Sequence, residues 1–209
     1  KPVRNCIRRG RRVYVPAVLR GNAVPAKALV EMVNLSNKKD AAVLAGLTIF
    51  GMDFINETWN GWVLHLSQRS ACWTAPGDTA LRTMVGWNIE IIFMFLISGI
   101  IYYYTLSENR HDKILGIPNW WFWAIGYSLF CVFVECLLNM GGHLVWEYAF
   151  WNRSFGGVWL IFLFGYLHFF LVSFWVHDMK TVRAKAITVG VIFGVAILGG
   201  VVFGVLGWI

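Results

Sequence analysis

Five apolar stretches constrain this chain more than any other feature of its sequence. A helix needs about 20 residues to cross the hydrocarbon layer of a membrane, and each stretch is about that long. The stretches cover residues 42–66, 85–106, 120–140, 157–176 and 186–208. With 58% hydrophobic and only 14% charged residues, the chain is also too apolar for a water-soluble domain of its length. We therefore predict an all-α, polytopic integral membrane protein whose residues 41–209 form a bundle of five transmembrane helices.

The distribution of Lys and Arg predicts the orientation of this bundle, because short loops rich in these residues stay on the cytoplasmic side. If the amino terminus is cytoplasmic, the inner segments hold fifteen of the 18 basic residues and the outer loops hold three. Trp residues gather near the ends of the stretches, as they do at membrane–water interfaces. We expect a multi-pass protein with a cytoplasmic amino terminus and a carboxyl terminus on the outer side, in a bacterial inner (plasma) membrane or an organellar membrane.

Residues 1–40 differ in composition from the rest, with ten basic residues against two acidic ones. Such a cluster beside a membrane span is attracted to anionic lipids, by about 1 kcal/mol per basic residue. After Pro25, the apolar residues up to Leu35 fall toward one side of a short amphipathic helix, which is typical of a helix on a membrane surface. The segment has one aromatic residue, Tyr14, and therefore no platform for base stacking. We predict a basic arm that lies on membrane lipids and binds no nucleic acid.

Acidic residues interrupt the first three predicted spans, although a charged side chain at the bilayer centre costs on the order of 2.5 kcal/mol or more. With a helical rise of 1.5 Å per residue, Glu57 and Glu135 lie about 12 Å inside the outer boundary, and Glu90 about 8 Å. Asp53 lies one turn deeper than Glu57 on the same helix face. His168, in the fourth span, reaches a similar depth of about 16 Å. We expect these side chains to turn away from lipid into one polar pocket that opens toward the outer leaflet.

Such a pocket favours acid–base chemistry on a lipid-soluble substrate. Carboxyl groups in a low-dielectric site keep a proton near neutral pH and can act as general acids. We expect Glu57 and Glu135 to be the acid and the base. Glu90 would adjust their pKa values, and Asp53 and His168 would orient the groups at the bottom of the pocket. One carboxyl group would protonate a carbon–carbon double bond of an isoprenoid or sterol-like molecule, and another would stabilise the cation or remove a proton. The enzyme would be an intramembrane isomerase, hydratase or oxidoreductase.

Two histidines keep a metal-assisted mechanism open. His65 and His143 lie at the outer boundaries of the first and third spans, each eight residues after a glutamate. Imidazole and carboxylate groups together are ligands for transition metals such as iron or copper. Two histidines at matched depth are also the usual axial ligands of a b-type haem. Iron, copper and haem are therefore the candidate cofactors, with His65 and His143 as nitrogen donors.

The last predicted span favours a different class of function. It carries six glycines in an otherwise aliphatic helix, at positions 190, 194, 199, 200, 204 and 207. Faces of small residues let membrane helices approach closely. We expect this helix to contact other membrane subunits through Gly190, Gly194, Gly200 and Gly204. The alternative interpretation of the chain is thus a non-catalytic subunit of a larger membrane complex, with a structural role or in contact with a cofactor or quinone.

Overall fold

The computed structural model of the chain describes residues 26–209. The greater part of the predicted basic arm, residues 1–25, therefore lies outside the described residues. From Ala26 the chain is helical, and the helix continues without a break to Ser67 as α1 (Ala26–Ser67). The chain divides into two compact units after Asp40. In the first unit, the apolar side chains of Val30, Met32 and Leu35 are exposed.

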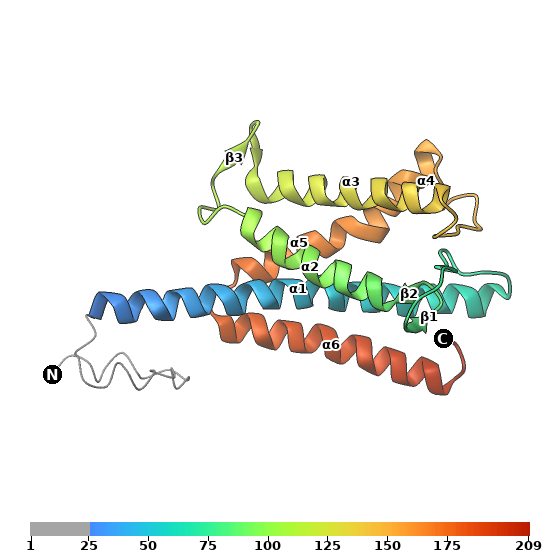
Figure 1. Cartoon of the computed structure of the whole chain (residues 1–209), viewed down its shortest axis with the longest axis horizontal. Helices are drawn as coiled ribbons and strands as arrows, with labels where there is room; N and C mark the ends of the chain where they lie inside the picture. Colours follow the sequence, from blue (N-terminus) through green and yellow to red (C-terminus); the bar gives the residue numbers. More distant parts are fainter. Residues whose placement is uncertain (1–25) are drawn as a thin grey trace. The chain divides into compact units, whose positions relative to one another are not determined.

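The second unit, Ala41–Ile209, is mostly helical, and each of the five predicted stretches contains a helix (Figure 1). After α1 the helices are α2 (Ile89–Thr105), α3 (Asn119–Met140), α4 (Phe155–Leu160), the π-helix η3 (Ile161–Leu167), α5 (His168–Asp178) and α6 (Val182–Val205). Half of the 16 buried residues of the core between them are aromatic, and its largest fully buried side chains are Tyr102, Phe169 and Phe170. Aromatic rings bury large areas and therefore contribute much of the packing between the helices.

Three helical segments of the described chain are long and apolar enough to cross a membrane. They are Asn119–Met140, Phe155–Asp178 and Val182–Val205. The helix α2 is apolar as well, but has only 17 residues. It begins four residues later than the apolar stretch predicts, because β1 (Arg82–Met84) and β2 (Trp87–Asn88) pair as an antiparallel hairpin just before it. The prediction that the second helix starts at residue 85 was therefore wrong.

The helices α1 and α2 cross at a point where each helix has a glycine. A Cβ atom on Gly99 would lie 2.7 Å from the carbonyl oxygen of Ala45 and from the Cα atom of Gly46. A Cβ atom on Gly46 would lie 2.6 Å from the carbonyl oxygen of Leu96. Only glycine allows backbones to approach this closely, as in other membrane helix pairs. This crossing fixes α2 against the helix that carries Asp53 and Glu57.

The helix α6 packs along α1 through aromatic rings. Phe193 contacts Phe50 with a ring-centroid distance of 5.3 Å, and Phe203 contacts Trp62 at 4.5 Å. The glycines of α6 are divided between this interface and open space. Gly200 lies beside Phe54, whereas Gly190, Gly194 and Gly204 have no described atom within 4 Å of the position of an added Cβ.

The fourth apolar stretch is one continuous helical segment with an irregular centre. In η3 the hydrogen bonds close wider turns than in an α-helix. Such π-turns are rare in proteins, and those that occur are often found at functional sites. The side chain of Asn56 on α1 donates to the carbonyl oxygens of Phe164 at 3.3 Å and Gly165 at 3.5 Å. A polar side chain from another helix thus satisfies carbonyl groups in the irregular turn.

Two loops cover the end of the bundle where α1 and α3 finish. Thr74 and Val145 form an antiparallel bridge between these loops, with N···O distances of 3.0 and 2.8 Å. The Trp73 ring stacks on Trp151 at 5.5 Å. Asn60 on α1 holds the first loop, since its side-chain amide donates to the Trp73 carbonyl oxygen at 2.8 Å and accepts from the Trp73 N–H at 3.2 Å. The covering loop is therefore fastened to the helix that carries Glu57.

Candidate functional site

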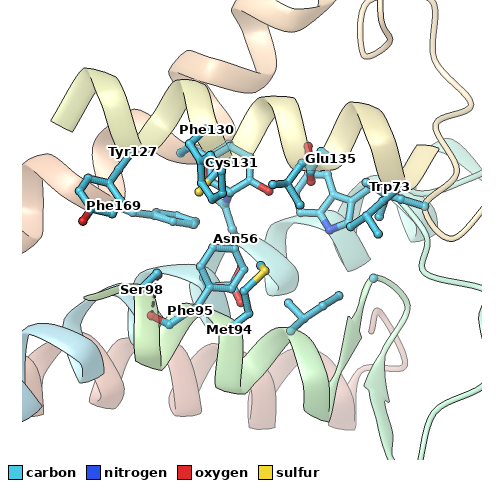
Figure 2. A pocket seen from close by; sticks show the side chains of 18 of the residues that line it. Asn56, Trp73, Met94, Phe95, Ser98, Tyr127, Phe130, Cys131, Glu135 and Phe169 are labelled. Atoms are coloured by element: carbon cyan, nitrogen blue, oxygen red, sulfur yellow. Dashed lines mark hydrogen bonds between the residues drawn. The ribbon is translucent and has the colours of Figure 1, made fainter. Parts of the chain in front are cut away.

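A cavity of about 200 Å³ lies among α1, α2, α3, η3 and α5. Three acidic residues line it: Asp53 and Glu57 from α1 and Glu135 from α3. The remaining wall is largely apolar and aromatic, and includes Phe95, Tyr127, Phe130, Trp151, Tyr166 and Phe169. Figure 2 shows the side chains of α2 and α3 on either side of the space, with Glu135 and Trp73 toward one end. The cavity therefore combines acidic groups with a surface suited to a hydrocarbon.

The two acidic residues of α1 are buried and each is bound by a tryptophan. Glu57 is 2% exposed, and its Oε1 atom accepts a hydrogen bond from the Trp73 indole N–H at 2.5 Å. Asp53 is also buried, and its Oδ2 atom accepts from the Trp87 indole N–H at 2.6 Å. Because the two residues are four apart, they stand on adjacent turns of one helix face. Trp73 comes from the covering loop and Trp87 from β2, so the segments outside the helices orient both carboxyl groups.

Glu135 faces this pair from the opposite helix. It is partly buried, and it lines the cavity together with Tyr166 of η3, whose hydroxyl interacts electrostatically with its carboxyl group. It is close enough to Asp53 and Glu57 for direct electrostatic interaction with both. Among the described residues, the second carboxyl oxygens of Glu57 and Glu135 are buried and have no well-formed hydrogen bond. Buried polar atoms without a partner are costly, so the acidic cluster does not fully satisfy its own hydrogen-bonding capacity.

Two residues expected in the pocket lie elsewhere. Glu90 is exposed, and its Oε2 atom accepts a hydrogen bond from the Thr79 hydroxyl at 2.6 Å. Its position follows from the late start of α2, which puts Glu90 in the first helical turn, where the helix dipole favours a negative charge. His168 is partly buried beside Phe169, with ring centroids 4.5 Å apart, and does not line the cavity. Of the five residues expected in the pocket, the structure thus brings together three: Asp53, Glu57 and Glu135.

The histidines expected to bind a metal or haem are also outside the cavity lining. His65 stacks on the Trp208 ring at 5.1 Å, and His143 is exposed in a loop. Residues 26–209 contain no group of three or more His, Cys, Asp or Glu side chains arranged to hold a metal ion.

The sequence did not single out Trp73, Trp87 or Tyr166 as partners of the acidic residues. The tryptophans near the span ends are typical of the membrane interface. That interpretation did not consider them as hydrogen-bond donors to buried carboxyl groups. An indole N–H that becomes buried needs an acceptor, and a nearby carboxyl group inside a span needs a donor. Matching these two needs is the signal that would have indicated the pairs in advance.

The fold and the cavity define a class of protein: a helical membrane protein with acidic residues gathered beside an apolar cavity. The chain belongs to a family described as an uncharacterized membrane protein family, whose model matches residues 27–205. An uncharacterized protein of Archaeoglobus fulgidus is 46% identical over 176 residues, which cover 84% of this chain and 82% of the relative. A second uncharacterized protein of that organism is 54% identical over 52 residues, or 24% of this chain and 91% of the relative. No solved structure matches the chain.

These comparisons place the protein in a membrane. The family is one of membrane proteins, and the described chain contains helices suited to crossing a bilayer. Both relatives are archaeal proteins, so they do not support the narrower expectation of a bacterial inner membrane or an organellar membrane.

Proposed function

We propose that this protein catalyses proton transfer on a lipid-soluble, isoprenoid or sterol-like substrate inside the membrane. The observation that carries the proposal is the meeting of Asp53, Glu57 and Glu135 beside an apolar cavity. Acidic residues within membrane spans have a high free-energy cost and usually mark functional sites. Glu57 and Glu135 each have a buried oxygen without a well-formed hydrogen bond among the described residues, but so do four tryptophans and two serines, so the proposal rests on the meeting of the three acidic groups.

The reaction that these residues support best is an isomerisation. One of Glu57 and Glu135 donates a proton to one carbon of a double bond, which leaves a cation on the other carbon of that bond. The second glutamate then removes a proton from the next carbon beyond the cation. The double bond shifts, and the substrate gains and loses one proton, so no oxidant, water or metal is required. The aromatic faces of Tyr127, Phe130 and Phe169 would stabilise positive charge that develops between the two steps. Hydration would need a water molecule and oxidation would need an oxidant as a further reactant, whereas the isomerisation needs only the acidic groups that line the cavity.

The proposal places the cavity in a bundle that crosses the membrane five times, with a cytoplasmic amino terminus. Three crossings correspond to the helices that are long and apolar enough. The 17 residues of α2 span about 26 Å, and the adjoining hairpin extends this segment toward the interface. The apolar half of α1 supplies the fifth crossing, because its acidic residues turn into the cavity rather than toward lipid. The excess of Lys and Arg in the inner segments supports the orientation.

Deuterium incorporation from solvent tests the catalytic proposal. The protein is reconstituted in vesicles of total lipid extract from Archaeoglobus fulgidus, the source of its relatives, and incubated in D₂O. Mass spectrometry then measures carbon-bound deuterium in the lipids. We expect incorporation with the wild type and a loss of about 10²-fold or more with Glu57→Gln or Glu135→Gln. Glu90→Gln is the matched control, because Glu90 is exposed and bound to Thr79 outside the cavity.

The result that would overturn the catalytic proposal is equal incorporation in all four proteins, or no incorporation above a protein-free control. Thermal unfolding of each variant separates a catalytic loss from a loss of folded protein. If Glu57→Gln and Glu135→Gln unfold at much lower temperature while the activity per folded molecule persists, the acidic cluster is structural.

A second proposal is a non-catalytic membrane subunit, and one observation favours it. Gly190, Gly194 and Gly204 leave parts of α6 open to a close approach by another helix. Gly200 is excluded from that face because it lies beside Phe54 of the same chain. Purification in mild detergent tests this proposal: stoichiometric companion chains that Gly194→Leu releases would support it, and an unaccompanied chain in native membranes would refute it.

A further inference from the structure

The cavity is too small to enclose a whole lipid. A cavity of about 150 Å³ in another protein holds one benzene ring, so about 200 Å³ corresponds to roughly eight carbon atoms. An isoprenoid or acyl chain of a membrane lipid is longer than this. A bound chain must therefore leave the cavity through an opening in its wall.

The exposed lining residues locate that opening between α2 and α3. Phe130 of α3 is 62% exposed and Met94 of α2 is 40% exposed, although both line the cavity. Ile101 and Leu138, on the same two helices, are also exposed lining residues. By contrast, Phe169 of the opposite wall is 1% exposed. Figure 2 shows Phe130 and Met94 on facing sides of the space. Because both line the cavity and both are exposed, we infer that its mouth lies between these two helices.

The chemistry of the lining changes from the mouth to the deep end. The four residues at the mouth are apolar, and α3 is among the helices suited to crossing a membrane. Exposed apolar side chains on such helices face the acyl chains of the bilayer, where water is scarce. The buried acidic groups Asp53 and Glu57 belong to α1, the helix behind the cavity. A water-soluble molecule would thus meet lipid at the mouth, whereas a hydrocarbon chain would not need to leave its own layer.

We propose that the cavity binds the hydrocarbon chain of a membrane lipid, which enters sideways from the acyl layer between α2 and α3. About eight carbons of the chain lie inside, next to Asp53, Glu57 and Glu135, and the remainder extends past Met94 and Phe130 into the bilayer. The inference rests on the proposed function for the chemistry at the acidic groups. Binding of the chain, however, requires no turnover and can be tested by itself.

Photo-crosslinking in vesicles tests the entry of a chain. The probe is a phosphatidylcholine with a diazirine near the end of one acyl chain, mixed into phosphatidylcholine vesicles that contain the full chain. We expect crosslinks to Phe95 and Phe169, which are buried but line the cavity, in addition to crosslinks on the lipid-facing surface. Phe133 of α3 is the internal reference, because it is exposed and does not line the cavity.

A matched pair of variants on α2 tests whether the label arrives through the cavity. Ser98 lines the cavity, so Ser98→Phe fills it, and we expect labelling of Phe169 to fall about tenfold or more relative to Phe133. Ile97 is exposed and does not line the cavity, so Ile97→Phe leaves the labelling unchanged. If Ser98→Phe fails to fold, Phe130→Ala provides a second measurement. It removes an exposed ring from the mouth, and we expect labelling of Phe169 to increase.

The outcomes separate this inference from the proposed function. Labelling of Phe133 without Phe95 or Phe169 overturns the lateral entry of a chain, even if lipids take up deuterium. Equal labelling in Ser98→Phe and Ile97→Phe also overturns it. Labelling of Phe95 and Phe169 that Ser98→Phe removes supports chain binding, and it does so even if no deuterium is incorporated and the catalytic proposal fails.

Discussion

The hydrogen bond between Trp73 and Glu57 should contribute a measurable coupling to the free energy of unfolding. Both groups are buried, and the N···O distance is 2.5 Å. Removing one partner of a buried hydrogen bond costs about 1–3 kcal/mol, because the other partner loses its bond without regaining water. Trp73→Phe and Glu57→Met each break the bond, whereas the double variant leaves no unmatched partner. We therefore expect a coupling energy of about 1–3 kcal/mol between the two substitutions.

Denaturant unfolding in mixed micelles measures the four free energies of this double-mutant cycle. The cavity that Trp73→Phe leaves, because a phenyl ring is smaller than an indole, appears in both the single and the double variant, so it cancels. Trp159 supplies the control cycle with Glu57→Met, because it is exposed on α4 and its ring contacts Phe155 and Phe162. That cycle should be additive within about 0.5 kcal/mol. Additivity in the Trp73 cycle as well would refute the assignment of Trp73 as the group that orients Glu57.

Two further predictions concern the helix crossing and the covering loop. Gly99→Ala brings a Cβ atom to 2.7 Å from Ala45, so the helices must separate by roughly 0.8 Å to restore normal contact. We expect thermal unfolding to show that Gly99→Ala lowers the free energy of unfolding by about 1–3 kcal/mol. The control Gly194→Ala, on the open face of α6, should leave the stability unchanged or raise it slightly. Equal effects of the two substitutions would contradict the close crossing. Burial raises the pKa of the Cys72 thiol from 9.0 to about 11, so less thiolate is present at any lower pH. Alkylation at pH 8 should thus be about 100-fold slower in the folded than in the unfolded protein, and equal rates would contradict the burial.

Apolar length was enough to predict that each of the five stretches contains a helix, because a helix that meets lipid must be apolar over its whole crossing, but it did not give the start of the first helix, which begins at Ala26. The third stretch, predicted at residues 120–140, is the helix Asn119–Met140. Length alone could not place the start of the second helix. Residues 85–88 belong to the predicted apolar stretch, yet residues 85 and 86 form a turn, and Trp87 and Asn88 pair with the strand Arg82–Met84. The choice between helix and hairpin depends on that pairing, which hydropathy does not record.

Depth along a helix predicted part of the acidic site but could not give the rotation of each helix. Glu57 and Glu135 were expected at equal depth, and both line the cavity. Glu90 was expected there too, but a residue in the first turn of a helix has a route to the surface, and its carboxyl group binds Thr79. His65 and His143 also matched in depth, yet one stacks on Trp208 and the other is exposed. Equal depth therefore selects candidates, while side-chain direction decides which of them meet.

The π-helix η3 makes the number of residues in its segment a structural constraint. Each added or removed residue turns an α-helix by about 100°. Deleting one residue from Ile161–Leu167 would leave a helix of ordinary pitch, but the side chains before and after the deletion would no longer share a direction. Tyr166 could then face Glu135 only if Phe155–Leu160 rolled away from its neighbours. A one-residue change in length at this point would separate the tyrosine from the acidic group without altering either of them.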